Sequence, residues 1–113
     1  MIKPLPEEKP PFTPFQKQIF VCTGPRCAPE SSPMLYTFLK TRLKELGLNE
    51  GPRRIHRSQC HCFGVCQGGP IVVVYPDNVW YHHVTSEKLE RILQEHILQG
   101  RPVEELVFYR GLP

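Results

Sequence analysis

Long apolar runs are absent from this chain of 113 residues. Its longest uninterrupted apolar or aromatic run, Ile71–Tyr75, is far shorter than the ~20 residues that a membrane-spanning helix requires. The first 14 residues also lack the apolar core of a secretory signal, because five prolines and four charged side chains interrupt them. These absences exclude a membrane partner and lead us to expect a soluble protein of the cytoplasm.

A strong excess of positive charge is also missing. The formal net charge is +3, whereas nucleic-acid-binding domains usually carry a basic stripe along one face. Arg53, Arg54 and Arg57 lie close together in the sequence and equal the whole excess. We therefore predict no nucleic-acid partner and a local role for these three arginines.

The Cys-x-x-Cys motif of thioredoxin-type dithiols does not occur, although the chain has five cysteines. In a reducing cytoplasm, clustered cysteines bind metal or carry out redox chemistry more often than they form structural disulfides. The residues alone leave four possibilities open: a [2Fe–2S] cluster on four thiolates, structural zinc, a disulfide or active dithiol, and unrelated buried thiols. The cysteines are Cys22, Cys27, Cys60, Cys62 and Cys66.

Prolines mark a boundary between a short arm and one domain. Their density near the N-terminus removes backbone donors and forbids a helix, so residues 1–15 are expected to form an arm in a polyproline-like conformation. Residues 16–113 then form a single domain, because a chain of this length supplies one hydrophobic core.

The order of the predicted elements indicates an α/β fold. Ile71–Tyr75 is typical of a central strand, and Pro76–Asn78 is a turn that leads to an antiparallel neighbour. Ser32 is typical of a helix N-cap and Gly47 of a helix end. We predict a four-stranded mixed sheet with two main helices, in the order βαβ then ββα. The predicted strands are Gln16–Cys22, Arg53–Gln59, Ile71–Tyr75 and Val79–Val84, and the predicted helices are Pro33–Leu46 and a segment from Thr85 or Ser86 to about Gly100.

This topology brings the two groups of cysteines together. The strands of a βαβ unit are parallel, so the first two strands end at the same edge of the sheet. Cys22 ends the first strand, and Cys60, Cys62 and Cys66 follow the second. Open α/β sheets usually place their functional sites at this edge.

The composition of the two cysteine loops favours an anionic cluster over inert thiols. Both loops contain glycine and proline, which allow backbone amides to approach an anion closely. An oxidised [2Fe–2S] centre on four thiolates carries a formal charge of about 2−. Arg26, His61 and the group at positions 53–57 are then expected to offset that charge.

Two segments carry a family resemblance, residues 22–27 (CTGPRC) and residues 62–70 (CFGVCQGGP). Together with VVVYPD at 72–77 and VWY at 79–81, they resemble the thioredoxin-like [2Fe–2S] ferredoxins, from about residue 17 to residue 106. The resemblance implies a thioredoxin-like fold with Cys22, Cys27, Cys62 and Cys66 as the cluster ligands. Cys60 departs from the family pattern; we interpret it as a spare thiol, with a ligand swap as the alternative.

The expected function follows from the ligand set. A cluster held by four thiolates has no open position for a substrate, and the chain offers no second catalytic constellation, so we predict a one-electron carrier that is not an enzyme. Its expected partners are redox proteins, and the resemblance also implies a homodimer. The alternatives are an iron–sulfur sensor or regulatory module, a non-catalytic subunit of a larger oxidoreductase, and a structural zinc protein.

Aromatic residues and histidines outside the cysteine loops receive structural interpretations. Trp80 and Tyr81 occupy successive strand positions and must point to opposite faces, so one is expected in the core and the other near the surface. We interpret His82 and His83 as an exposed strand end, and His96 as a solvated or partly packed residue of the last helix.

Overall fold

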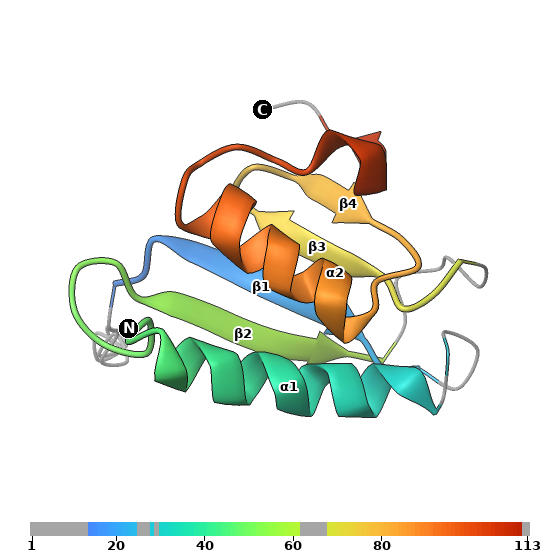
Figure 1. Cartoon of the computed structure of the whole chain (residues 1–113), viewed down its shortest axis with the longest axis horizontal. Helices are drawn as coiled ribbons and strands as arrows, with labels where there is room; N and C mark the ends of the chain where they lie inside the picture. Colours follow the sequence, from blue (N-terminus) through green and yellow to red (C-terminus); the bar gives the residue numbers. More distant parts are fainter. Residues whose placement is uncertain (1–13, 25–27, 29, 62–67, 112–113) are drawn as a thin grey trace, which may run out of the picture.

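A mixed β-sheet with both helices on one face forms the fold in the computed structural model (Figure 1). The structure describes residues 14–24, 28, 30–61 and 68–111, so nearly all of the predicted arm lies outside the described residues. Within these ranges, none of the helices is long and apolar enough to cross a membrane. The elements are β1 (Lys17–Cys22), α1 (Ser31–Glu45), β2 (Ile55–Cys60), β3 (Val72–Tyr75), β4 (Val79–Tyr81), α2 (Ser86–Arg91), the π-helical segment η1 (Ile92–Ile97), the 3₁₀ segment η2 (Glu104–Leu106) and β5 (Val107–Arg110).

The predicted strand pairing is confirmed. The sheet order is β2-β1-β3-β4-β5, with β1 and β2 parallel and the other neighbouring pairs antiparallel. The hairpin between β3 and β4 contains Asn78 with φ +57°, in the left-handed region that asparagine tolerates in tight turns. The parallel pair places the ends of β1 and β2 at one edge.

The predicted number of strands is wrong, because the sheet has a fifth strand. Residues Val107–Arg110 pair with β4 and form the edge strand β5. The β-branched and aromatic residues Val107, Phe108 and Tyr109 carry the usual strand signal, but the prediction assigned no strand or helix after the last helix.

The first helix is predicted correctly, but its N-cap is not. Glu30 occupies the N-cap position of α1 without a capping side-chain hydrogen bond, and Ser32 is buried inside the first turn. At the other end, Gly47 has φ +70° and donates its N–H to the Lys44 carbonyl, as expected of a terminating glycine. Thr85 is the predicted cap of α2, and its side chain accepts from the Lys88 N–H.

The two faces of the sheet have different coverings. The helix-facing side holds the larger apolar core, in which Ile19 and Val21 of β1 pack with Leu39 and Leu43 of α1. The opposite side, which we call the open face, has a smaller cluster of Cys22, Ile71 and Val73, against which Phe20 and Trp80 pack. The open face consists of Gln18, Phe20, Cys22, His56, Ser58, Cys60, Val73, Tyr75, Trp80 and Tyr109, which strand alternation and register place on one side.

A buried hydrogen-bond network joins the β3–β4 turn to the last helix. His96 is fully buried, with Nε2 2.5 Å from an Asp77 carboxylate oxygen and Nδ1 2.7 Å from the Tyr81 hydroxyl oxygen. The Tyr81 oxygen accepts from the Val103 N–H at 3.1 Å, and Lys17 Nζ donates to both Asp77 oxygens. If the Tyr81 hydroxyl donates to Nδ1, the His96 proton resides on Nε2 and the ring is neutral.

The prediction that His96 is solvated or partly packed is therefore wrong. Helical spacing placed it beside Ile92 and Leu93, but a polar partner in a distant turn cannot be read from spacing alone. Burial lowers the pKa of His96, while the hydrogen bond that His96 donates to Asp77 acts in the opposite direction. Burial also raises the pKa of Tyr81 to about 12.

Stability should decrease as the pH falls below about 6.5, the ordinary pKa of histidine. The folded pKa of His96 is lower than the unfolded value, so between the two values the unfolded state binds more protons. The expected slope is at most about 1.4 kcal/mol per pH unit, measured as the unfolding free energy in urea. A His83→Asn variant, altered at an exposed histidine with φ +49°, should show the same slope. A flat profile from about pH 7 to about pH 5 would contradict the assignment.

Candidate functional site

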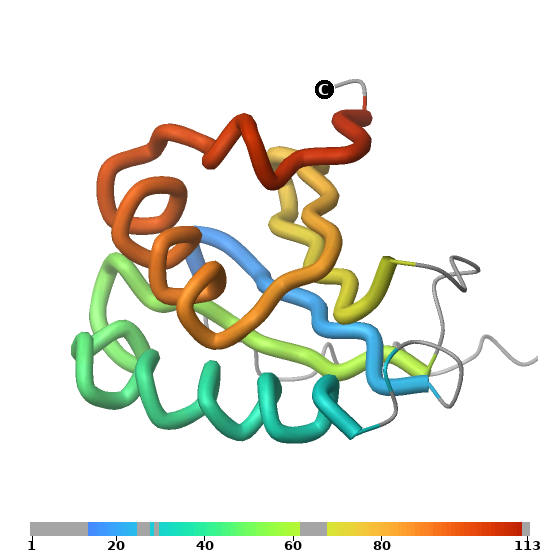
Figure 2. The backbone as a smooth tube through the Cα atoms, turned by 45° about the vertical axis from the view of Figure 1, so that its right-hand side comes forward, coloured from blue at the N-terminus to red at the C-terminus, as the bar shows by residue number. Residues whose placement is uncertain are grey.

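Two cysteines end neighbouring parallel strands at the same edge of the sheet (Figure 2). Cys22 is the last residue of β1 and Cys60 is the last of β2, and the two are register partners. The backbone ladder continues past them, since the Thr23 N–H donates to the Cys60 carbonyl at 2.7 Å. The predicted convergence of the two cysteine groups is therefore correct for these two residues.

The start of β3 completes this edge. The Cys22 N–H donates to the Ile71 carbonyl at 3.0 Å, and the Cys22 sulfur lies 4.0 Å from the His61 carbonyl oxygen. Gly68, with φ +75°, accepts from the His83 N–H at 2.6 Å. Residues on both sides of the segment 62–67 thus lie close to Cys22.

Of the four predicted ligands, Cys22 alone falls within the described residues. Cys27, Cys62 and Cys66 lie outside them. Across the described ranges, no group of three or more histidine, cysteine, aspartate or glutamate side chains is arranged to hold a metal ion. The structure nevertheless brings the residues that flank the predicted ligands to one edge.

The described thiols supply sulfur, the donor atom that a soft metal site uses. Cys22 is fully buried, whereas Cys60 is partly exposed. Burial raises the pKa of the Cys60 thiol, and the neighbouring Cys22 raises it further. Cysteine sulfur is the usual ligand of both iron–sulfur clusters and structural zinc, so the residues present fit either group.

The predicted counter-charge role is wrong for Arg53 and Arg54. Both precede β2, which extends about 17 Å from its first residue to Cys60. Arg53 instead donates to the Leu98 carbonyl at 3.3 Å, beside the last helix. These two side chains therefore lie at the opposite end of the strand from the cysteine edge.

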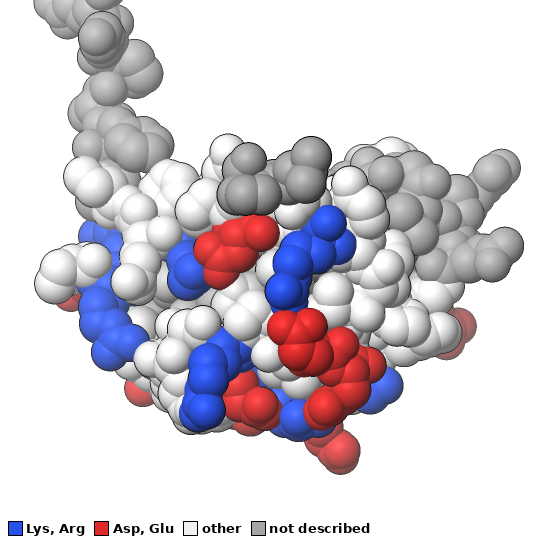
Figure 3. All heavy atoms as spheres, turned by 90° about the horizontal axis from the view of Figure 1, so that it is seen from above, with Lys and Arg blue, Asp and Glu red and all other residues white. Residues whose placement is uncertain are grey.

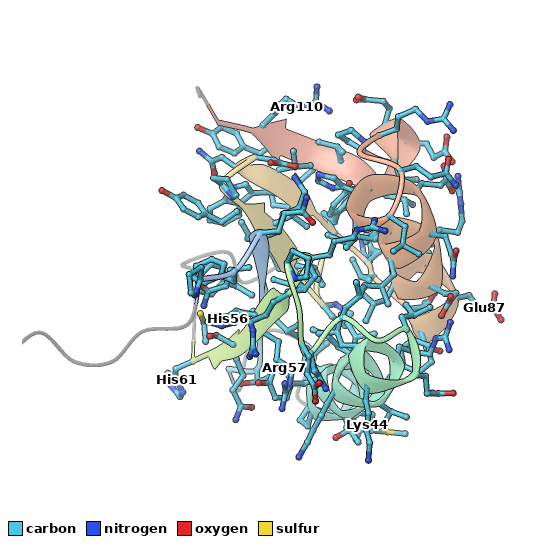
Figure 4. All side chains as sticks on the ribbon, turned by 90° about the vertical axis from the view of Figure 1, so that its left-hand side faces the viewer. Lys44, His56, Arg57, His61, Glu87 and Arg110 are labelled. Atoms are coloured by element: carbon cyan, nitrogen blue, oxygen red, sulfur yellow. The ribbon has the colours of Figure 1, made fainter. Side chains whose placement is uncertain are left out.

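The other predicted counter-charges have different positions. Arg57 points toward α1, with its guanidinium 6.0 Å from the centre of the Tyr36 ring. His61 is exposed at the end of β2, on the side away from the helices (Figure 4). Arg26 lies outside the described residues. His61 is thus the described member of this group that lies at the cysteine edge.

The open face is a feature that the sequence reasoning missed. Its ten residues include no lysine, arginine, aspartate or glutamate. Tyr75 and Tyr109 on this face are 55% and 54% exposed, and the Trp80 ring packs edge-on against Tyr109. The prediction that Trp80 and Tyr81 separate is confirmed, because Tyr81 is fully buried on the helix side. The sequence feature that indicates this face is the uncharged residue at every second position of the strands.

Charged side chains gather instead toward the helical layer, where both signs are interspersed (Figure 3). One example is the ion pair between Arg42 of α1 and Glu90 of α2, with a shortest distance of 2.6 Å. The hydrogen bond from Arg42 lowers the pKa of Glu90. Charge therefore distinguishes the two faces of the molecule as clearly as helix coverage does.

Comparison with known proteins gives a consistent result. Residues 12–96 match the family model described as thioredoxin-like [2Fe-2S] ferredoxin. The chain is 37% identical over 93 residues to a Clostridium pasteurianum protein named "Ferredoxin, 2Fe-2S", and the match covers 78% of this chain and 91% of that protein. It is 48% identical over 52 residues to a protein of the same name from Aquifex aeolicus, with 46% and 47% covered.

Solved structures agree with the fold described above. The wild-type thioredoxin-like [2Fe-2S] ferredoxin from Aquifex aeolicus superposes with a TM-score of 0.71 at 31% identity, covering 82% of this chain and 96% of that chain. Another structure of a thioredoxin-like [2Fe-2S] ferredoxin from this organism gives a TM-score of 0.73, also at 31% identity, with 86% and 94% covered. The predicted thioredoxin-like α/β fold is confirmed.

Proposed function

The chain belongs to the thioredoxin-like [2Fe–2S] ferredoxin family, and from this premise we propose that it is a one-electron carrier whose cluster is held by Cys22, Cys27, Cys62 and Cys66. Its cofactor is a [2Fe–2S] cluster, and its role is electron transport with redox partner proteins. The four ligands are the cysteines at the family's motif positions. Cys60 is not a ligand in this proposal.

The structural observation that supports this ligand set is the position of Cys22. Cys22 lies beside the residues that flank segment 62–67, through the His61 carbonyl on one side and the Ile71 carbonyl on the other. Cys62 and Cys66 both belong to that segment. The described chain therefore ends at His61, next to the Cys22 sulfur, and resumes at Gly68, three residues before the Ile71 carbonyl that accepts from the Cys22 N–H.

In this proposal the protein binds the cofactor, and the cofactor supplies the redox chemistry. When bound, a [2Fe–2S] cluster supplies a one-electron couple. Four thiolates fill the protein-facing positions of both irons, so no substrate binds there and the protein is not an enzyme. We also place this carrier in the cytoplasm, where a reducing environment keeps thiols available for a cluster.

Chemical analysis of the purified protein tests the proposal. We expect a brown protein with iron and acid-labile sulfide in equal amounts. A colourless protein that contains zinc would overturn it in favour of a structural zinc site. A cluster that is lost on reduction would instead favour an iron–sulfur sensor.

We further propose that the protein is a homodimer that packs through the β3–β5 part of the open face, around Tyr75, Trp80 and Tyr109, which leaves Cys60 on the opposite edge strand β2 uncovered. A two-fold interface packs one patch against a second copy of itself, so a patch with charge of one sign repels its copy and an uncharged patch avoids this cost. The open face meets this requirement, and its exposed Tyr75 and Tyr109 are typical of interface residues. The charged helical layer does not meet it.

The Tyr109→Lys variant should weaken this dimer about 100-fold or more, because it buries two like charges in an apolar contact. Sedimentation of wild type and variant measures the effect. Met34→Lys is the matched control, since Met34 is 73% exposed on α1, away from the open face. A monomeric wild type, or equal dissociation constants for wild type and Tyr109→Lys, would refute this interface.

A further inference from the structure

Cys22 and Cys60 form a thiol pair across β1 and β2. They are register partners in a parallel pairing, so both side chains point to the open face. Neighbouring strands lie about 4.8 Å apart, within the roughly 4.4–6.8 Å between Cα atoms that a disulfide bridges. Backbone hydrogen bonds from Cys22 to Ile71 and from Thr23 to Cys60 hold both residues in place.

We propose that this pair is an oxidation site, at which Cys22 and Cys60 form a reversible disulfide when the chain lacks its cluster. The consequence for the cluster rests on the proposed function. Cys22 is a proposed ligand, so iron would occupy its sulfur in the loaded protein. In the cluster-free chain the Cys22 sulfur is free to react with Cys60, which the strand pairing holds beside it.

Exposure sets the order of the reaction. Cys60 is partly exposed and meets an oxidant first, whereas Cys22 is fully buried and can only react second. With hydrogen peroxide as the oxidant, the Cys60 thiolate attacks one oxygen, the O–O bond breaks, and a sulfenic acid and one water result after proton transfer. The Cys22 sulfur then attacks the sulfenic sulfur, which forms the S–S bond and releases a second water.

The overall reaction is balanced. Two thiols and one hydrogen peroxide give one disulfide and two waters, so the two sulfurs together lose two electrons. A dithiol reductant returns two electrons and two protons and restores both thiols. The disulfide thus prevents oxidation of the Cys60 sulfenic acid to sulfinic acid and holds Cys22 in a form that a dithiol can reduce, so reduction makes the proposed ligand available again.

Peptide mapping tests the proposal. Cluster-loaded protein is treated with hydrogen peroxide and an iron chelator, alkylated, and digested with trypsin without reductant. Trypsin separates Cys22 on peptide Gln18–Arg26 from Cys27, and Ser58–Lys88 carries the other three cysteines. We expect these two peptides to be linked, with fragmentation placing the bond at Cys60. The link should disappear after treatment with a dithiol.

Two variants separate this proposal from random pairing among the cysteines. Cys62→Ala lacks a proposed ligand, so it is prepared without a cluster under reducing conditions before peroxide is added, and it should retain the link to Cys22. Cys60→Ala should leave most of Cys22 alkylated. A link from Cys22 mainly to Cys62 or Cys66, or an equal yield in Cys60→Ala, would overturn the proposal.

The visible spectrum of the Cys60→Ala protein, recorded before peroxide is added, tests the ligand assignment independently of the disulfide. A coloured Cys60→Ala protein supports the assignment whatever the peptide map gives. A colourless one overturns the assignment alone, because the wild-type peptide map still decides the disulfide.

Discussion

Replacing Cys22 with alanine should give a colourless protein with almost no bound iron or sulfide. Cys22 is the proposed ligand that falls within the described residues, where it ends β1 and is fully buried. Alanine removes the sulfur donor but fits the same space, so the strand pairing with β2 and β3 should persist. Iron analysis and the visible spectrum measure the loss of the cluster, and far-ultraviolet circular dichroism checks that the fold remains.

Cys60→Ala is the matched control for this experiment. Cys60 occupies the same register position on the neighbouring strand and is also a thiol near the edge, but it is not a proposed ligand. Its variant should keep its colour and its iron. The account is wrong if the Cys22→Ala protein stays brown, and a colourless Cys60→Ala protein would give Cys60 the role of a ligand.

The His96→Ala variant should strongly destabilise the protein, although it lies away from the cysteine edge. It removes the partner of both Asp77 and the Tyr81 hydroxyl and leaves a cavity where a fully buried ring was. Lost hydrogen bonds and the cavity together should lower the unfolding free energy by about 3 kcal/mol or more. For a domain of this size, that corresponds to a fall of more than about 10 °C in the melting temperature.

Tyr81→Phe gives the graded comparison. It removes only the hydroxyl, which accepts from Val103 and contacts His96, and should cost about 1–2 kcal/mol. Thermal melts of both cluster-loaded variants, run anaerobically, measure the difference. A His96→Ala protein that melts within about 2 °C of wild type would show that the network contributes little.

Local patterns predicted most of the fold. The helical spacing of α1, the Thr85 cap of α2 and the turn at Asp77 and Asn78 are all short-range signals, and each proved reliable. The errors arose where distant residues decide the outcome. β5 forms because β4 offers a free edge, and His96 is buried because Asp77 reaches it from another element.

The candidate site was predictable in its location but not in its surroundings. The parallel βαβ rule alone brought Cys22 and Cys60 to one edge, and the structure agrees. The counter-charge prediction failed for Arg53 and Arg54, because closeness in sequence becomes distance along an extended strand. The open face was missed because an uncharged surface appears only when the register of several strands is known.

Electron paramagnetic resonance during stepwise anaerobic reduction shows whether the protein carries one electron on a [2Fe–2S] cluster. A [2Fe–2S] carrier takes up one electron, so the account predicts one unpaired spin per chain at full reduction. Reoxidation should restore the starting visible spectrum without loss of iron. A protein that stays free of unpaired spin, or that releases its iron when reduced, would contradict the account.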